Sequence, residues 1–283
     1  MPEAARVIVT RPAREAQRWV QQLQQLGFAA EALPLIEIAP VDDPAELQAL
    51  QQAWQGLSDY AACLFVSGNA VAYFFQGNKA LAQQLWAQAA INSIADQVSG
   101  PRCMAPGPGT VAALRAVGVP AGQIDAPAAD AQQFDSEALW ASVGQRDWQG
   151  RRVLIVRGAS AVAGTASVGR DWIAQQWQAA GAQVDFVAVY QRRTPTLTAA
   201  QSERARAAGA DGSIWLFSSS EAVANLASLS AMAGIDWSRA RAVATHPRIV
   251  DAVRAAGWGV VVASRPALKD ISATLRSIES GYP

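Results

Sequence analysis

Short runs of β-branched residues alternate along the chain with longer amphipathic stretches that are rich in Ala, Gln, Arg and Leu. This alternation is typical of βαβ units, in which helices connect the strands of a mostly parallel sheet. Four of the amphipathic stretches are followed by a glycine, at residues 27, 118, 181 and 257. A glycine at this position ends a helix in the left-handed conformation at little cost. The pattern therefore predicts an α/β fold.

The same pattern gives the position of each expected element. Strands are expected at residues 6–9, 29–33, 62–66, 102–105, 153–156, 183–189, 214–217, 241–243 and 259–262. Helices are expected at residues 13–26, 44–55, 68–75, 81–90, 109–116, 136–142, 170–179, 199–208, 220–228, 247–255 and 267–278.

Parts of the sequence resemble one another, which indicates an internal duplication. Three matches occur in the same order in both copies, and each joins the end of a strand to the helix after it. A duplication of this kind predicts two similar domains with a cleft between them. The matching segments are 65–71 with 217–223, 108–118 with 247–257, and Val9-Thr10-Arg11 with Val156-Arg157-Gly158.

Composition excludes several classes of protein. The chain has 283 residues, of which 51% are hydrophobic and 16% charged, so it is not disordered and is long enough for two domains. Basic and acidic residues number 23 each, so no overall positive field attracts nucleic acid or an anionic membrane surface. Because no apolar run has the length of a membrane span, we expect a soluble protein that binds any anionic ligand locally.

The N-terminus and the cysteines indicate the compartment. Pro2, Glu3 and Arg6 stand where a signal peptide needs an apolar stretch. Cys63 and Cys103 do not make a disulfide framework, which fits a reducing environment. We therefore expect a cytoplasmic protein.

His246 is the only histidine of the chain. A His-based metal cluster is thereby excluded, and neither cysteine has a second Cys or a His at ligand spacing, so no metal site is expected. Since Pro247 follows it, the interpretation that His246 caps a helix or lines a cleft is favoured over a role as a base.

Hydroxyl-bearing, small or arginine residues stand where each duplicated strand passes into its helix. Backbone N–H groups are free at a helix N-terminus, and the helix dipole there favours negative charge. Several such ends around one cleft would bind a polycarboxylate without a positive net charge. The alternative is that Ser, Thr and Asn are simply good helix caps, and for a single turn this alternative is at least as good.

The loop Gly107-Pro108-Gly109-Thr110 formally fits a dinucleotide fingerprint, with Asp130 at the distance of a ribose contact. The prolines stiffen a loop whose amides would have to approach a pyrophosphate. An ordinary Gly/Pro turn is therefore the favoured interpretation.

Tyr190 ends the apolar run 184–189 and precedes Gln191 and Arg192. It therefore lies where a buried strand emerges into a polar segment. From the sequence alone, a core tyrosine with a satisfied hydroxyl is favoured over a functional one.

Eight segments in their order and spacing carry a resemblance to a known family. They are 9–12 (VTRP), 65–71 (FVSGNAV), 106–110 (PGPGT), 134–139 (FDSEAL), 157–158 with 169–170 (RG, GR), 187–192 (VAVYQR), 216–219 (LFSS) and 264–266 (SRP). With these segments, which extend over essentially the whole chain, the sequence resembles the uroporphyrinogen-III synthases.

The resemblance implies two flavodoxin-like parallel-sheet domains joined by a two-stranded linker, with a cleft between the domains. Residues 1–36 and 190–283 would form a discontinuous first domain, and residues 37–189 the second. The linker strands would lie at about 33–38 and 187–192.

The resemblance also implies a function. A monomer without metal or organic cofactor would convert hydroxymethylbilane, which carries eight carboxylates, to uroporphyrinogen III with inversion of ring D and loss of water, as part of haem biosynthesis. Tyr190 would assist the departure of hydroxide. The substrate-binding residues implied are Thr10, Arg11, Ser67, Gly68, Asn69, Gly109, Thr110, Arg157, Gly158, Ser218, Ser219 and Thr245.

Two other functions stay open at this point. A two-domain protein could bind a small molecule without turnover, or a nicotinamide-dependent oxidoreductase could use the Gly107 loop.

Overall fold

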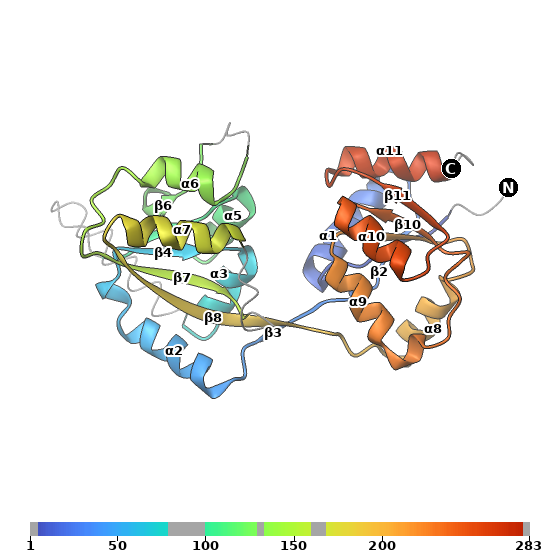
Figure 1. Ribbon diagram of the computed structural model, residues 1–283, viewed down its shortest axis with the longest axis horizontal. Coiled ribbons are helices and arrows are strands. Elements are labelled where there is room, and N and C mark those ends of the chain that lie inside the picture. Colours follow the sequence, from blue (N-terminus) through green and yellow to red (C-terminus); the bar gives the residue numbers. More distant parts are fainter. Residues whose placement is uncertain (1–4, 79–99, 129–132, 160–167, 280–283) are drawn as a thin grey trace. The chain divides into compact units, whose positions relative to one another are not determined.

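The computed structural model describes residues 5–78, 100–128, 133–159 and 168–279. The chain divides into two compact units (Figure 1). Unit 1 comprises Met1–Ile38 and Arg193–Pro283, and unit 2 comprises Ala39–Arg192. Each unit contains its own parallel sheet, so the expected α/β class with two parallel-sheet domains is confirmed.

Unit 1 is a five-stranded sheet in the order β11-β10-β9-β1-β2, and all neighbouring strands in it are parallel. This is the flavodoxin-like order. Helices α8, α9 and α10 cover the face that carries Trp215 and Phe217, and α1 and α11 cover the face that carries Val7 and Val9. The elements are β1 (Val7–Val9), α1 (Ala13–Gln25), β2 (Ala30–Ala32), α8 (Ala199–Ala207), β9 (Ile214–Phe217), α9 (Ser220–Ser228), β10 (Arg241–Ala244), α10 (Pro247–Ala255), β11 (Val260–Ala263) and α11 (Leu268–Glu279).

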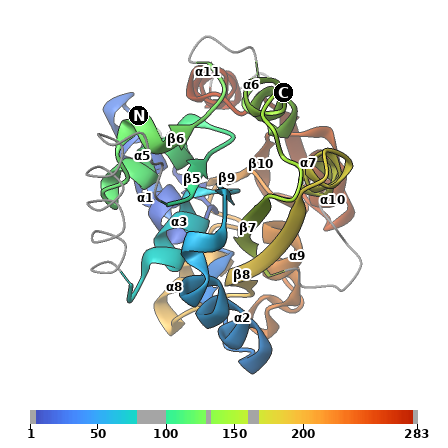
Figure 2. The ribbon, with the colours of Figure 1, turned by 90° about the vertical axis from the view of Figure 1, so that its left-hand side faces the viewer.

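Unit 2 contains a six-stranded sheet in the order β3-β8-β7-β4-β5-β6. Helices α6 and α7 cover one face, and α2, α3 and α5 lie on the other (Figure 2). The elements are β3 (Glu37–Pro40), α2 (Pro44–Gln55), β4 (Ala62–Phe65), α3 (Gly68–Phe75), β5 (Arg102–Met104), α5 (Pro108–Ala116), β6 (Ile124–Asp125), α6 (Ser136–Val143), β7 (Arg152–Gly158), α7 (Val168–Ala179) and β8 (Gln183–Arg193).

The duplication expected from the sequence is visible in the topology. Unit 1 reads β2-β1-β9-β10-β11 across its sheet, and unit 2 reads β8-β7-β4-β5-β6. The matched segments therefore occupy equivalent strands: β9 corresponds to β4, β10 to β5, and β1 to β7. The two units have the same strand order across their sheets, but the chain forms the equivalent strands in a different succession in each unit.

The structure differs from the expected elements near the unit boundaries. Of the linker strand expected at 33–38, only residues 37–38 lie in a strand, β3, whereas residues 187–192 all lie in β8. The amides of Leu33 and Leu35 still bond to the carbonyl oxygens of Val9 and Thr10. A regular parallel register would take the Leu35 amide to the carbonyl oxygen of Arg11, so the bond to Thr10 marks an irregular register after β2. The two-residue strand β6 was not expected, and the helix expected at 81–90 and Asp130 lie outside the described residues.

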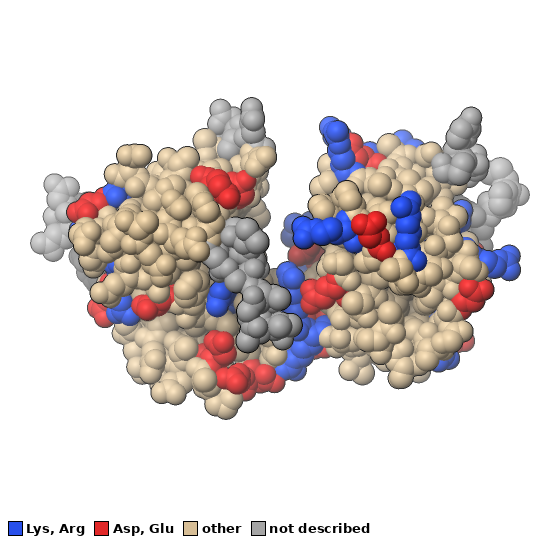
Figure 3. Space-filling model, viewed as in Figure 1, with Lys and Arg blue, Asp and Glu red and all other residues tan. Residues whose placement is uncertain are grey.

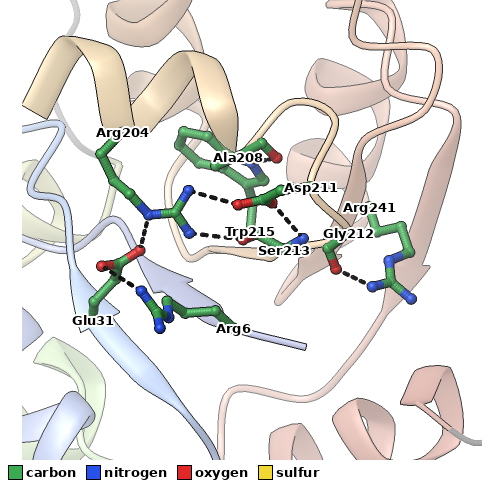
Figure 4. Close-up of polar contacts among 9 residues, drawn as sticks. All are labelled: Arg6, Glu31, Arg204, Ala208, Asp211, Gly212, Ser213, Trp215 and Arg241. Carbon is green, nitrogen blue, oxygen red and sulfur yellow. Dashed lines mark hydrogen bonds and ion pairs between the residues drawn. The ribbon is translucent and has the colours of Figure 1, made fainter. Parts of the chain in front are cut away.

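An ion-pair network joins three elements at the amino edge of the unit 1 sheet (Figure 4). Arg204 of α8 donates to Glu31 of β2, to Asp211 at 2.9 Å and to Ser213 at 2.8 Å. Arg241 donates to the carbonyl oxygen of Gly212. The network ties α8 to the strands that it covers.

The charges are mixed on the surface. On the face drawn in Figure 3, basic and acidic side chains occur on both units. Among the described residues, none of the helices is both long and apolar enough to span a membrane.

Candidate functional site

The carboxyl ends of β4 and β8 bring Ser67 and Tyr190 together in unit 2. Ser67 is the N-cap of α3, and its Oγ accepts a hydrogen bond from the amide of Ala70 at 3.1 Å. The same Oγ lies 3.3 Å from the hydroxyl oxygen of Tyr190. The phenol hydroxyl is therefore held at the N-terminus of a helix, where partial positive charge accumulates.

Tyr190 is buried, with 4% of its surface exposed. Its ring centroid is 6.0 Å from that of Tyr73 on α3. Its carbonyl oxygen accepts a hydrogen bond from the amide of Ala159 at 2.7 Å. The sequence favours a core tyrosine with a satisfied hydroxyl. The ring is buried, and its hydroxyl is satisfied by the Ser67 cap at the carboxyl edge of the sheet.

The N-termini of α3 and α5 are neighbours at the same edge. A Cβ at Gly68 would lie 3.7 Å from the Cβ of Ala113 and 3.8 Å from the carbonyl oxygen of Gly109. Gly107 caps α5 without a side-chain hydrogen bond, and Thr110 is buried in its first turn. Gly68, Asn69 and Gly109 supply first-turn amides here, whereas Pro108 has no N–H and the Thr110 amide bonds to the carbonyl oxygen of Gly107 at 3.1 Å.

Arg157 lies on the opposite face of the sheet from Tyr190. Its guanidinium stacks 4.5 Å above the ring centroid of Phe186. Phe186 pairs in register with Ile155, which belongs to the core under α6 and α7. The structure therefore does not bring Arg157 to the Ser67 and Tyr190 pair, although its neighbour Gly158 lies against the Tyr190 ring.

The remaining predicted residues lie at the carboxyl edge of unit 1, after β1, β9 and β10. Thr10 is buried and donates to the carbonyl oxygen of Leu216 at 2.8 Å, so its hydroxyl joins two strands. Ser219 caps α9 by accepting from the amide of Glu221 at 3.2 Å. Thr245 follows β10, and its amide bonds to the carbonyl oxygen of Phe217. Ser218 is half-buried beside them.

Arg11 lies at the start of α1 and is held in place by its own helix. Its guanidinium stacks 4.6 Å above the Trp19 ring, and Nη1 lies 3.3 Å from a carboxylate oxygen of Glu15. Its Nε is buried without a hydrogen-bond partner in the part of the chain that the structure describes. The indole and the carboxylate fix the direction of this cation.

His246 is the N-cap of α10. Its Nδ1 accepts a hydrogen bond from the amide of Arg248 at 3.1 Å, and the residue is exposed. The prediction that His246 caps a helix is confirmed.

The two thiols are structural. Cys63 and Cys103 are paired in register on β4 and β5, and both are buried. Burial raises the pKa of each thiol well above its ordinary value, which leaves them protonated and unreactive. Over the described ranges, no group of three His, Cys, Asp or Glu residues forms a metal site.

Sequence reasoning missed Tyr73 and the relation between Gly158 and Tyr190. Tyr73 stands one helical turn after Asn69, and this spacing could have placed both on one face of α3. The contact between Gly158 and Tyr190 joins two strands, so it had no local signal.

Comparisons with known proteins agree with this architecture. Residues 17–273 match the model of the family described as uroporphyrinogen-III synthase HemD. The structure of uroporphyrinogen-III synthetase from Helicobacter pylori is similar over 97% of this chain and 99% of its own, at 12% identity and a TM-score of 0.53. A mutant uroporphyrinogen III synthase from the extremely thermophilic bacterium Thermus thermophilus is similar over 98% of this chain and 100% of its own, at 17% identity and a TM-score of 0.51. At these identities the structural likeness concerns the fold.

Proposed function

Because this chain belongs to the uroporphyrinogen-III synthase HemD family of hydro-lyases in tetrapyrrole biosynthesis, we propose that Tyr190 assists the loss of water from its substrate. The family implies that the substrate is hydroxymethylbilane. The observation that carries the proposal is the phenol hydroxyl held 3.3 Å from Ser67 at the start of α3. We also propose that helix N-termini bind the carboxylates of the substrate.

The reaction needs little covalent help from the protein. The lone pair of a pyrrole nitrogen expels the hydroxyl group of the linear substrate, so the C–O bond breaks and hydroxide leaves. A proton supplied to that oxygen converts it to water. The methylene carbon freed on ring A then bonds to the substituted carbon of ring D, and the bond from that carbon to the bridge of ring C breaks. The bridge carbon bonds instead to the unsubstituted α-carbon of ring D, which loses its proton, so ring D is inverted and one water is lost overall. Holding the two ends of the substrate in place is therefore the larger contribution of the protein.

The position of Tyr190 suits a proton or hydrogen-bond donor. Its hydroxyl is at the N-cap of α3, and the amides of the first turn favour the negative charge that develops when the phenol donates. Burial keeps bulk water from competing for the same hydroxyl. The Ser67 hydroxyl can accept from the phenol or donate to it, so the pair can adjust as the substrate oxygen gains its proton.

The carboxylates of the substrate would be bound mainly by backbone amides. The adjoining first turns of α3 and α5 contain the amides of Gly68, Asn69 and Gly109, and amides at helix N-termini are suited to anions. The Thr110 amide already bonds to Gly107, so Thr110 would act by shaping the turn. In unit 1 we propose the same role for the turns after β9 and β10, with Arg11 as the side-chain cation.

The structure modifies two expected roles. The Thr10 hydroxyl is already bonded to Leu216, which favours a structural role for Thr10. Arg157 would have to reach a carboxylate from its place above Phe186, so its binding role stays a prediction. The monomeric state and the cytoplasmic location also stay predictions. Nothing observed favours the binding-protein or oxidoreductase alternative over the family function.

The test is the variant Tyr190→Phe. Turnover should fall by roughly 10² or more, the low end for a positioned acid, while the melting temperature stays close to that of the wild type because the ring remains. The product should still be the type III isomer. Wild-type turnover would reduce Tyr190 to a packing residue.

Tyr60→Phe is the matched control. Tyr60 is equally buried, but it precedes β4 and its hydroxyl accepts from Arg152 at 3.1 Å at the amino edge of the sheet. Burial and the neighbouring Asp185 raise the pKa of Tyr60 to about 12. Loss of this hydroxyl should leave turnover unchanged.

A further inference from the structure

Gly158 lies against the ring of Tyr190. A Cβ at this position would lie 2.7 Å from Cε2 and Cζ of the tyrosine and 3.0 Å from its hydroxyl oxygen. Contacts this short do not occur between packed atoms, so any side chain at residue 158 would displace the ring. The tyrosine occupies the space that a Cβ would fill.

The backbone conformation does not explain this glycine. Nine glycines of the described chain have a positive φ, which favours glycine, and Gly158 is not among them. Its φ is accessible to alanine. The requirement for glycine therefore comes from the neighbouring side chain and not from the fold of β7.

An irregularity in β8 turns Tyr190 toward Gly158. Along the ladder Arg157 pairs with Ala188, whereas Gly158 pairs with Tyr190, so one extra residue of β8 lies between these pairs. A bulge of this kind redirects the side chain that follows it. The amide of Ala159 then bonds to the carbonyl oxygen of Tyr190 at 2.7 Å and fixes the strand in this register.

We infer that Gly158 is a positioning residue: its missing side chain and the bulge in β8 together let the Tyr190 ring reach Ser67. This inference rests on the proposed role of Tyr190. It assigns to Gly158 a different role from substrate binding, which the family resemblance implies. The substrate does not need to touch Gly158 for a substitution there to impair the reaction.

The first test is Gly158→Ala, measured as kcat, KM and melting temperature. Because the added methyl pushes the phenol away from Ser67, kcat should fall toward the level of Tyr190→Phe, by roughly 10². KM should change little. Gly122→Ala is the matched control, since a Cβ at Gly122 would have nothing within 4 Å, and it should behave as the wild type.

The decisive measurement repeats Gly158→Ala in two backgrounds. Because the added methyl contacts the ring, Gly158→Ala should lower the melting temperature of the wild type, and it should do the same in Tyr190→Phe, where the ring is still present. In Tyr190→Ala the ring is absent, and the alanine should then change kcat and melting temperature by less than their errors. If Tyr190→Ala does not fold, Tyr190→Val removes the ring and leaves a smaller cavity for the same comparison.

The outcomes separate this inference from the proposed function. Wild-type kcat in Gly158→Ala, or an equal loss of kcat with and without the ring, would overturn the positioning role. If Tyr190→Phe retains wild-type turnover, the proposed role of the phenol fails. In that case Gly158→Ala should still lower the melting temperature only where a ring is present, and its failure to do so would overturn the steric relation as well.

Discussion

The two units share one strand order but differ at the strands that correspond to β7 and β8. Unit 2 ends β7 with Gly158 and carries Tyr190 near the end of β8. Unit 1 has Arg11 where the sequence match places Gly158, and the segment after β2 carries the buried Leu35. The carboxyl edge of the sheet thus holds a phenol in unit 2, and the equivalent edge of the other sheet holds a fixed cation in unit 1.

The helix starts after β4 and β9 differ much less. Ser67 caps α3 and Ser219 caps α9, each through its hydroxyl oxygen. Anion-binding turns can be duplicated with the fold, because they need only a helix N-terminus and a small cap. A buried phenol at the same edge needs a glycine opposite it, and only the described strands of unit 2 supply that pair. Under the proposed function, both units would bind carboxylates and unit 2 alone would supply the proton-donating group.

The largest expected effect concerns the independence of the two units. A fragment of residues 39–192 should give native-like circular dichroism and unfold cooperatively, because it contains β4, β5, β6, β7 and nearly all of β8 with the core that they share. A cut at the middle of the sequence separates β4 from β7, which are paired in the sheet, so both halves should fail to fold. Two folded halves would contradict the division into these units.

A smaller effect should distinguish a buried carboxylate of unit 2 from a partly exposed one of unit 1. Asp125 is nearly buried and accepts paired hydrogen bonds from Arg102 and Arg146 at 2.6 to 2.8 Å. Asp125→Asn should lower the free energy of unfolding by about 2 kcal/mol, since it removes charged hydrogen bonds. Glu31→Gln should cost about 0.5 kcal/mol, because Glu31 and Arg204 are partly exposed. Urea unfolding measures both, and equal losses would contradict the distinction.

The effect of Asp125→Asn on stability should depend on pH. Burial alone would raise the pKa of Asp125, but the hydrogen bonds from Arg146 and Arg102 outweigh burial and lower it. This carboxylate therefore stabilises the fold above its unfolded pKa, about 4, and its contribution is lost as the pH falls through the lower folded value. The difference in stability between wild type and Asp125→Asn should shrink on acidification below about pH 4. A difference that grows on acidification would contradict the lowered pKa.

Helix caps and most strands could be predicted from the sequence, because residues only a few positions apart determine them. The cap at His246, the turns at Ser67 and Ser219, and most strands follow from hydrophobic periodicity and capping residues a few positions apart. A linker strand was expected at 33–38 from its apolar character, but Leu33 and Leu35 bond irregularly to the segment that ends β1, and β3 begins at Glu37. Its position follows from a tertiary hydrogen-bond pattern and not from apolar character.

The candidate site was less predictable because its parts come from distant segments. Ser67 and Tyr190 are 123 positions apart, and only the strand order places β4 near β8. The family resemblance drew attention to Gly158, but the requirement for glycine there comes from the Tyr190 ring on another strand, which no local pattern shows. Arg157 was expected beside Gly158 in the site, yet successive residues of a strand point to opposite faces, so its side chain lies above Phe186.

The smallest effect, and the sharpest test of the comparison, contrasts the two serine caps. Ser67→Ala and Ser219→Ala should each lower the free energy of unfolding by about 1 kcal/mol, the usual value of an N-cap.

Ser67→Ala also removes the hydroxyl beside Tyr190. Its turnover should therefore fall by about threefold to tenfold, the value of one hydrogen bond, and Ser67→Thr should restore most of it. Ser219→Ala should keep turnover within about twofold of the wild type, because its hydroxyl caps α9 and the proposed binding there uses backbone amides. The measurements are kcat and unfolding free energy for all three variants. Equal losses of turnover in the two alanine variants would mean that the phenol does not depend on Ser67 and that the two helix starts contribute in the same way.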